Sequence, residues 1–156
     1  MDRRLFIAGV ASAALTAGRV MAEPAERLYY NPLRTPDDVK GFVLEGEARV
    51  DFDTGRMRLK NARSAADGQA SNFVYWCPEI FPDNVEFRWN FWPLEEPGLC
   101  IFFFAAQGLL PEGTGSLFDK RLKPRAGIYE QYTQSDVSAL QMAYFRRRWP
   151  SERAFH

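Results

Sequence analysis

The residues best suited to chemistry in this 156-residue chain share one face of a short alternating stretch, 84–92. Successive side chains of a strand point to opposite sides, so Glu86, Arg88, Asn90 and Trp92 lie on the face opposite the apolar residues between them. Sugar recognition needs a flat ring to stack on the sugar and polar groups to hold its hydroxyls. This face is therefore a candidate sugar-binding platform, and the alternative is the solvated side of a sheet.

Catalytic carboxylates are harder to find. Hydrolysis of a glycosidic bond needs two carboxyl groups about 5 to 9 Å apart. Glu95 and Glu96 are adjacent, and they would point to opposite sides of an extended chain. No strand-like stretch carries carboxylates in an E-x-D-x-x-E arrangement. The sequence therefore gives a retaining hydrolase little support.

Metal ligands are also scarce. The single histidine, His156, is the last residue, and no Cys/His spacing of a zinc site is present. Asp51 and Asp53 precede Gly55 and could contribute to a calcium site, but Asp before a glycine turn is also ordinary turn chemistry. We therefore predict no metal site and no cofactor, with calcium as the alternative.

The elements that position these residues are predicted to be strands. Residues 84–92 alternate, whereas 99–106 are apolar on both faces and must be covered on both sides. Joined by the short connection 93–98, they predict the centre of an antiparallel β-sandwich. Residues 72–77 predict another strand, and Asp53-Thr54-Gly55 predicts the turn of a hairpin.

Two further stretches indicate helical structure. Thr35-Pro36 is typical of a cap followed by proline at the first position of a short turn. Residues 135–149 fit both a helix capped by Ser135 and a strand with Leu140, Met142 and Tyr144 on one face. Propensity alone favours the helix.

Composition bounds the class of protein. The chain is 46% hydrophobic and 26% charged, as expected for a globular protein. Its formal net charge is zero, and apart from Arg146 to Arg148 its basic residues are scattered, so nucleic acid is not an expected partner. No apolar run reaches the roughly 20 residues of a membrane span, so none is predicted.

Residues 1–22 resemble an export signal. Arg3 and Arg4 precede an apolar segment diluted by Ala and Gly, and Val20-Met21-Ala22 is a small-residue cleavage site. The arginine pair is typical of a twin-arginine signal, so we expect the export machinery as a partner and a periplasmic or secreted location. The alternative is an uncleaved anchor or a buried amphipathic helix. The rest of the chain, 23–156, is then one domain.

The two cysteines, Cys77 and Cys100, both lie in apolar strand-like runs. In an exported protein they could form one disulfide. Two buried free thiols fit the sequence equally well, because twin-arginine substrates normally fold before export.

Several motifs together resemble a known family. They are YNPLR (30–34), FVYWCPE (73–79), EPGLC (96–100), FFAA (103–106), LFD (117–119), YFRR (144–147) and ERAF (152–155). The chain resembles a bacterial family of unknown function with a concanavalin A-like jelly-roll fold, often associated with rhamnogalacturonan and pectin utilisation. The resemblance implies an all-β, two-sheet antiparallel sandwich and a strand near residues 140–146. It supplies no catalytic assignment.

Length adds one expectation. Jelly rolls of this type usually run to roughly 200 residues or more, and this chain stops just after ERAF. We therefore expect the sandwich to be incomplete at the C-terminus, with this chain as the N-terminal part of the family's domain.

A weaker likeness concerns catalysis. Residues 125–132 resemble the G-x-Y-x-Q strand of jelly-roll alginate lyases, which implies a polysaccharide lyase using Tyr129, with Arg125 and Gln131 beside it. The Arg and His partner motifs of those lyases are not evident. We predict an exported protein that binds or processes plant-type oligo- or polysaccharide. The alternatives are this lyase and a structural or partner-binding sandwich without a sugar ligand.

Overall fold

The computed structural model describes residues 26–147, and the predicted export signal, ERAF motif and His156 lie outside them. The chain divides into two compact units, Met1–Tyr30 and Asn31–His156. In the described part of the first, the Arg27 guanidinium carbon lies 5.1 Å from the centroid of the Tyr30 ring. All described helices and strands belong to the second unit, and no described helix is long and apolar enough to cross a membrane.

The second unit is mostly β. Its elements in chain order are η1 (Pro36–Val39), β1 (Val43–Gly46), β2 (Ala48–Asp51), β3 (Arg58–Asn61), η2 (Ala65–Ser71), β4 (Phe73–Trp76), β5 (Leu99–Leu110), β6 (Gly113–Gly115), α1 (Glu130–Thr133) and β7 (Val137–Arg146).

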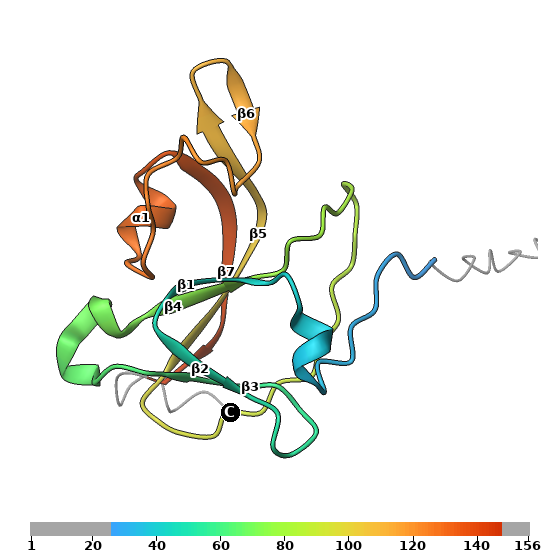
Figure 1. Ribbon diagram of the computed structural model, residues 1–156, viewed down its shortest axis with the longest axis vertical. Helices are drawn as coiled ribbons and strands as arrows, with labels where there is room; N and C mark the ends of the chain where they lie inside the picture. The colour runs from blue at the N-terminus through green and yellow to red at the C-terminus, as the bar shows by residue number, and fades with distance from the viewer. Residues whose placement is uncertain (1–25, 148–156) are drawn as a thin grey trace, which may run out of the picture. The chain divides into compact units, whose positions relative to one another are not determined.

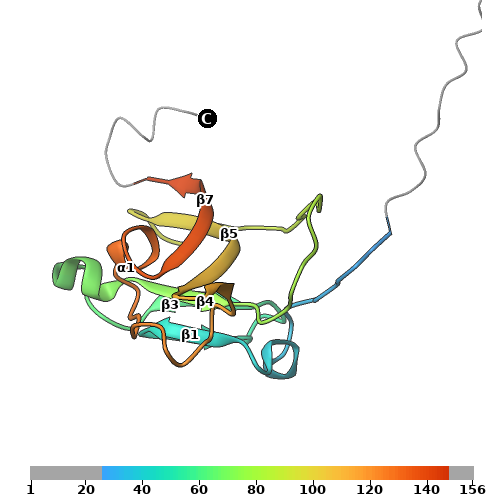
Figure 2. The same ribbon diagram turned by 90° about the horizontal axis from the view of Figure 1, so that it is seen from above.

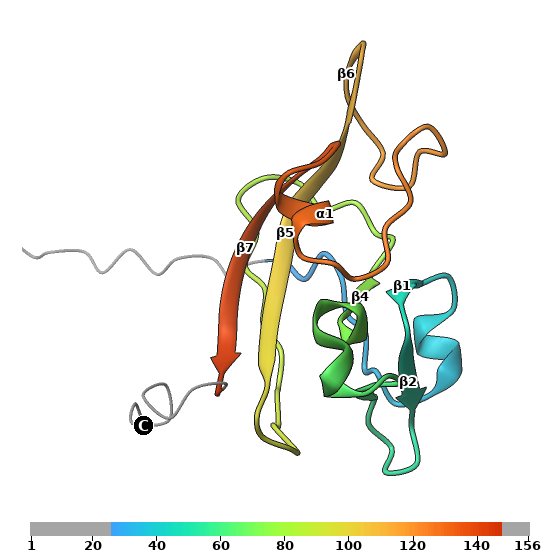
Figure 3. The same ribbon diagram turned by 90° about the vertical axis from the view of Figure 1, so that its left-hand side faces the viewer.

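The strands form three antiparallel ladders among the described residues: β1–β4, β2–β3 and β6–β5–β7. In Figure 1, β5 and β7 run side by side, with β6 at the far end of β5. Figure 2 shows this pair above β1, β3 and β4, and Figure 3 shows it as a layer facing β1, β2 and β4. The prediction of an antiparallel, predominantly β fold is thus confirmed at this coarser level.

The predicted hairpin is confirmed as β2–β3. Its turn is closed by the Gly55 amide, which donates to the Phe52 carbonyl at 2.8 Å, and Gly55 adopts the left-handed φ of 68° that suits glycine. The predicted cap is confirmed at η1, a 3-10 helix. There the Asp38 carboxylate accepts from the Arg34 and Thr35 amides, each at 2.8 Å, and these bonds lower the pKa of Asp38.

The helix that propensity favours at 135–149 is wrong over the described residues, because Val137–Arg146 form strand β7. The pairing of β7 with β5 determines the outcome: Ile101 lies opposite Ala143, and Phe103 opposite Gln141. Strand preference depends on cross-strand packing, which a single segment does not encode. The family resemblance predicted this strand correctly.

Residues 84–92 form no strand ladder, which corrects the predicted central strand. The alternation itself is confirmed by packing. The Phe87 and Trp89 ring centroids both lie 5.1 Å from that of Phe102 on β5, and Phe91 lies 4.9 Å from Tyr144 on β7. Aromatic packing therefore holds this extended segment against the β5–β7 pair.

The buried core is small and lies around α1, β4 and β7. Trp76, Leu117, Tyr132 and Val137 form one buried cluster. Phe103 on β5 packs against it, with its ring centroid 5.9 Å from that of Trp76. This cluster joins the β1–β4 ladder to the β5–β7 pair.

Candidate functional site

All four side chains of the predicted platform are exposed. The Arg88 guanidinium donates to both carboxylate oxygens of Glu86, at 2.6 and 3.0 Å, and this lowers the pKa of Glu86. Because both side chains reach solvent, the pair adds little to stability. Asn90 and Trp92 are exposed beyond it, so the structure presents the predicted face to solvent.

Trp92 has a partner that sequence reasoning missed. The guanidinium carbon of Arg56, in the β2–β3 turn, lies 4.3 Å from the centroid of the Trp92 ring, a cation–π contact. The Trp92 side chain nevertheless remains 53% exposed. Lys60 on β3 also bonds Glu95 at 2.6 Å, so the hairpin contacts this segment twice.

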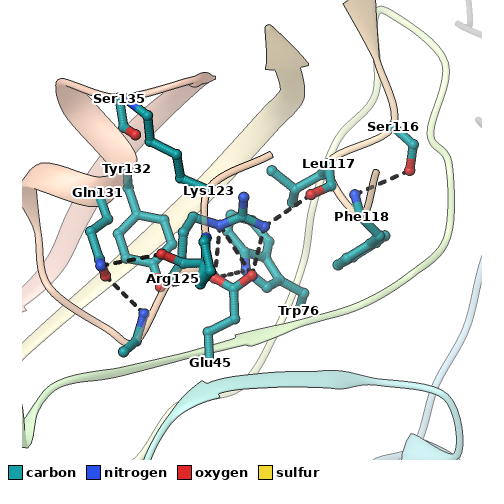
Figure 4. A network of polar contacts seen from close by, with 12 residues as sticks. Glu45, Trp76, Ser116, Leu117, Phe118, Lys123, Arg125, Gln131, Tyr132 and Ser135 are labelled. Atoms are coloured by element: carbon teal, nitrogen blue, oxygen red, sulfur yellow. Dashed lines mark hydrogen bonds and ion pairs between the residues drawn. The ribbon is translucent and has the colours of Figure 1, made fainter. Parts of the chain in front are cut away.

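A buried polar network lies at the other side of the core, and sequence reasoning also missed it (Figure 4). The Glu45 carboxylate on β1 accepts from the Arg125 guanidinium at 2.6 and 3.1 Å, from the Tyr132 hydroxyl at 2.8 Å and from the Trp76 indole N–H at 3.0 Å. Arg125 also donates to the Leu117 carbonyl at 2.9 Å. The Arg125 and Glu45 side chains are only 6% and 10% exposed. These residues link β1, β4, the 116–129 connection and α1.

Burial and the hydrogen bond to Glu45 raise the pKa of Tyr132, so its hydroxyl stays protonated at neutral pH. The same oxygen accepts from the Gly127 amide at 3.1 Å. An open depression of about 280 Å³ borders the network, and its lining includes Glu45, Asp119, Lys123 and Arg125. Because Glu45 and Arg125 neutralise each other, the network fits a role in holding the 116–129 connection.

The lyase-like residues do not share one site. Arg125 is held by Glu45, whereas Tyr129 and Gln131 stand at the start of α1 instead of on a strand. The Gln131 side-chain oxygen accepts from the Ala126 amide at 2.8 Å and so holds the loop before the helix. The Tyr129 hydroxyl is exposed and accepts from Gln141 at 2.6 Å.

The described residues offer no obvious metal centre. No group of three or more His, Cys, Asp or Glu that could hold an ion occurs between residues 26 and 147. Asp51 is paired with Arg58 at 3.8 Å, and Asp53 lies in the β2–β3 turn. Both cysteines are free thiols, and burial raises the pKa of Cys100.

Comparison with known proteins places the chain in a family. The model of DUF1961, a domain of unknown function, matches residues 26–156. The chain belongs to the DUF1961 family. It is 44% identical over 128 residues to the uncharacterized protein YesU of Bacillus subtilis (strain 168), covering 82% of this chain and 54% of that protein. The predicted resemblance to a family of unknown function is thus confirmed.

A solved structure supports the fold of this DUF1961 chain. A crystal structure of a Bacillus subtilis protein of unknown function with a galectin-like fold matches it with a TM-score of 0.69 and 41% identity. The match covers 83% of this chain and 55% of that protein, so the chain spans about half the length of both relatives. A galectin-like fold is of the jelly-roll type, in agreement with the predicted class.

Proposed function

We propose that this DUF1961 chain belongs to an exported protein that binds plant-type polysaccharide of the pectin or rhamnogalacturonan class. The observation that carries the proposal is the exposed face at 86–92, where a half-exposed tryptophan stands beside polar side chains. The galectin-like fold of the 41% identical structure supports it by analogy. The proposal takes the three ladders as parts of one two-sheet jelly-roll sandwich.

The platform offers the contacts that a sugar needs. The Trp92 ring supplies a flat apolar surface, and Arg56 holds it in place from the hairpin. Asn90 carries two donors and an acceptor for hydroxyl groups. Glu86 and Arg88 exchange hydrogen bonds only with solvent-exposed partners, so a sugar hydroxyl can enter their pair at little cost.

Binding is favoured over cleavage because the cation of the lyase-like set is already occupied. The Arg125 guanidinium is 6% exposed and donates to Glu45 and to a backbone carbonyl. It would have to leave both acceptors to reach a sugar carboxylate. Leaving Glu45 buried and unpaired would be costly.

The test is Trp92→Ala in the full chain, with a glycan array to find the ligand and calorimetry to measure affinity. We expect a loss of about 1 to 3 kcal/mol of binding free energy, as for stacked aromatic contacts, with stability changed by less than about 0.5 kcal/mol. Trp89→Ala is the matched control, because Trp89 packs on Phe102 from the opposite face. It should lower stability and leave the affinity of the folded protein unchanged.

Two results would contradict the proposal. One is an array on which the folded protein binds no glycan, which would favour a structural or partner-binding role. The other is a Trp92→Ala variant that retains full affinity, which would place the sugar elsewhere.

Export has its own test. The arginine pair and the small-residue site motivate cleavage after Ala22. N-terminal sequencing of exported protein should begin at Glu23, and replacing Arg3 and Arg4 by lysine should leave precursor in the cytoplasm. Exported protein that still begins at Met1 would contradict cleavage, and unimpaired export of the lysine variant would contradict the twin-arginine route.

A further inference from the structure

The β2–β3 hairpin carries a basic hollow that the proposed platform does not include. It has a volume of about 380 Å³ and is lined by Arg49, Lys60, Asn61, Ala62, Arg63 and Ser64. Half of these lining residues are cationic and none is acidic. The whole chain has no net charge, so this is a local concentration of positive charge.

The register of the hairpin brings two of these cations together. Arg49 on β2 lies directly opposite Lys60 on β3. Directly opposite side chains have Cβ atoms about 5 Å apart, and like charges in such a pair are destabilising. An anion placed between the two side chains would turn this repulsion into attraction.

The cations of the hollow are either unoccupied or weakly held. Arg49 forms no ion pair with any residue from 26 to 147. Arg63 contacts Glu47 at 3.5 Å and Asp67 at 3.3 Å, and all three side chains are at least 41% exposed. Lys60 pairs with Glu95, whose side chain is 69% exposed. Exposed pairs of this kind contribute little, so a ligand carboxylate can replace them.

The hollow is connected to the proposed sugar platform. The hairpin that carries it also supplies Arg56 to the ring of Trp92, and Lys60 bonds Glu95 in the connection that follows. A chain of sugars stacked on Trp92 therefore has a basic surface on the adjoining element.

We propose that this hollow binds the carboxylate of a uronic acid residue, with Arg49 as its principal contact. The planar guanidinium of arginine fits a carboxylate with two parallel hydrogen bonds, and Lys60 adds a point charge. The Ser64 hydroxyl oxygen accepts from the Ala66 amide, which leaves its O–H to donate to a sugar oxygen. The inference rests on the proposed polysaccharide-binding function and narrows the ligand to acidic glycans.

The experiment compares two probes on the full chain: galacturonic acid oligomers and the same oligomers with their carboxylates methyl-esterified. We expect the wild type to bind the acidic form more tightly. Arg49→Gln should weaken binding of the acidic form about tenfold, as for loss of a charged hydrogen bond, and leave the esterified form unchanged. Because Arg49→Gln relieves the repulsion with Lys60, its melting temperature should equal or exceed that of the wild type.

Lys120→Gln is the control, because it removes the same charge at an exposed residue that lines neither hollow. It should leave both affinities unchanged. Equal binding of acidic and esterified oligomers, unaffected by Arg49→Gln, would refute the carboxylate site and leave the proposed function standing. Binding of neither form would count against the proposed function itself. Inorganic phosphate that displaces the acidic oligomer at equal concentration would show a general anion site and overturn the uronate assignment.

Discussion

Replacement of Glu45 by glutamine tests the buried network most directly. The substitution keeps the size and shape of the side chain but removes its charge. In the wild type this carboxylate accepts from Arg125, Tyr132 and Trp76. An amide has one oxygen where the carboxylate has two, so several of these donors lose their acceptor together.

The expected magnitude follows from burial. The Arg125 side chain is 6% exposed, so its guanidinium would keep its positive charge without a compensating carboxylate. Breaking a buried pair by removing one partner costs about 3 to 5 kcal/mol. A domain is stable by only about 5 to 15 kcal/mol, so Glu45→Gln removes a large part of the stability of this one.

Urea denaturation of the full chain, followed by tryptophan fluorescence, measures this loss. Glu47→Gln is the matched control, because Glu47 is 63% exposed and meets Arg63 only at 3.5 Å. It should change the free energy of unfolding by less than about 0.5 kcal/mol. Replacing both Glu45 and Arg125 by methionine should recover much of the loss, since no buried charge is left unpaired. A Glu45→Gln variant as stable as Glu47→Gln would refute this account.

Three further outcomes are expected. Because the pKa of Tyr132 is raised above its ordinary value of 10.0, the folded state holds this proton longer than the unfolded state, so stability should fall as pH rises above 10, and less steeply in Tyr132→Phe. Gly127→Ala should prevent stable folding in thermal melts, because its Cβ would overlap the Asn72 carbonyl at a φ of +85°, whereas Gly55→Ala, with open space around it, should cost about 1 kcal/mol. If the protein is a lyase, it should release unsaturated, ultraviolet-absorbing ends from a pectic polymer, and Tyr129→Phe should abolish that signal; no signal from the wild type would remove the lyase.

Local patterns predicted the parts of the fold that local interactions decide. The turn at Asp53 to Gly55 is fixed by the conformational freedom of glycine, and the β2–β3 hairpin follows from it. Residues 137–146 contain no such local signal. Their strand depends on β5, which lies far away in the sequence, so only the resemblance to a family predicted it.

The alternation at 84–92 shows the limit of periodicity. It predicted correctly which side chains pack and which face solvent, because both depend only on an extended backbone. It did not predict whether a neighbouring strand pairs with that backbone. Glu45 shows the opposite failure, because a carboxylate in a short strand is ordinarily expected at the surface. Its partners Trp76, Arg125 and Tyr132 lie 31, 80 and 87 residues away, so only the folded chain reveals its burial.

The β2–β3 hairpin links the two proposed contacts with a polysaccharide. Its turn holds the Trp92 ring through Arg56, and its β3 strand holds Glu95 through Lys60. A sugar carboxylate that enters the basic hollow must compete with Glu95 for Lys60. Release of Glu95 would remove one of the two contacts that fix the platform segment to the hairpin. Acid binding in the hollow and ring stacking on Trp92 should therefore influence each other, and by linkage the effect must be equal in both directions.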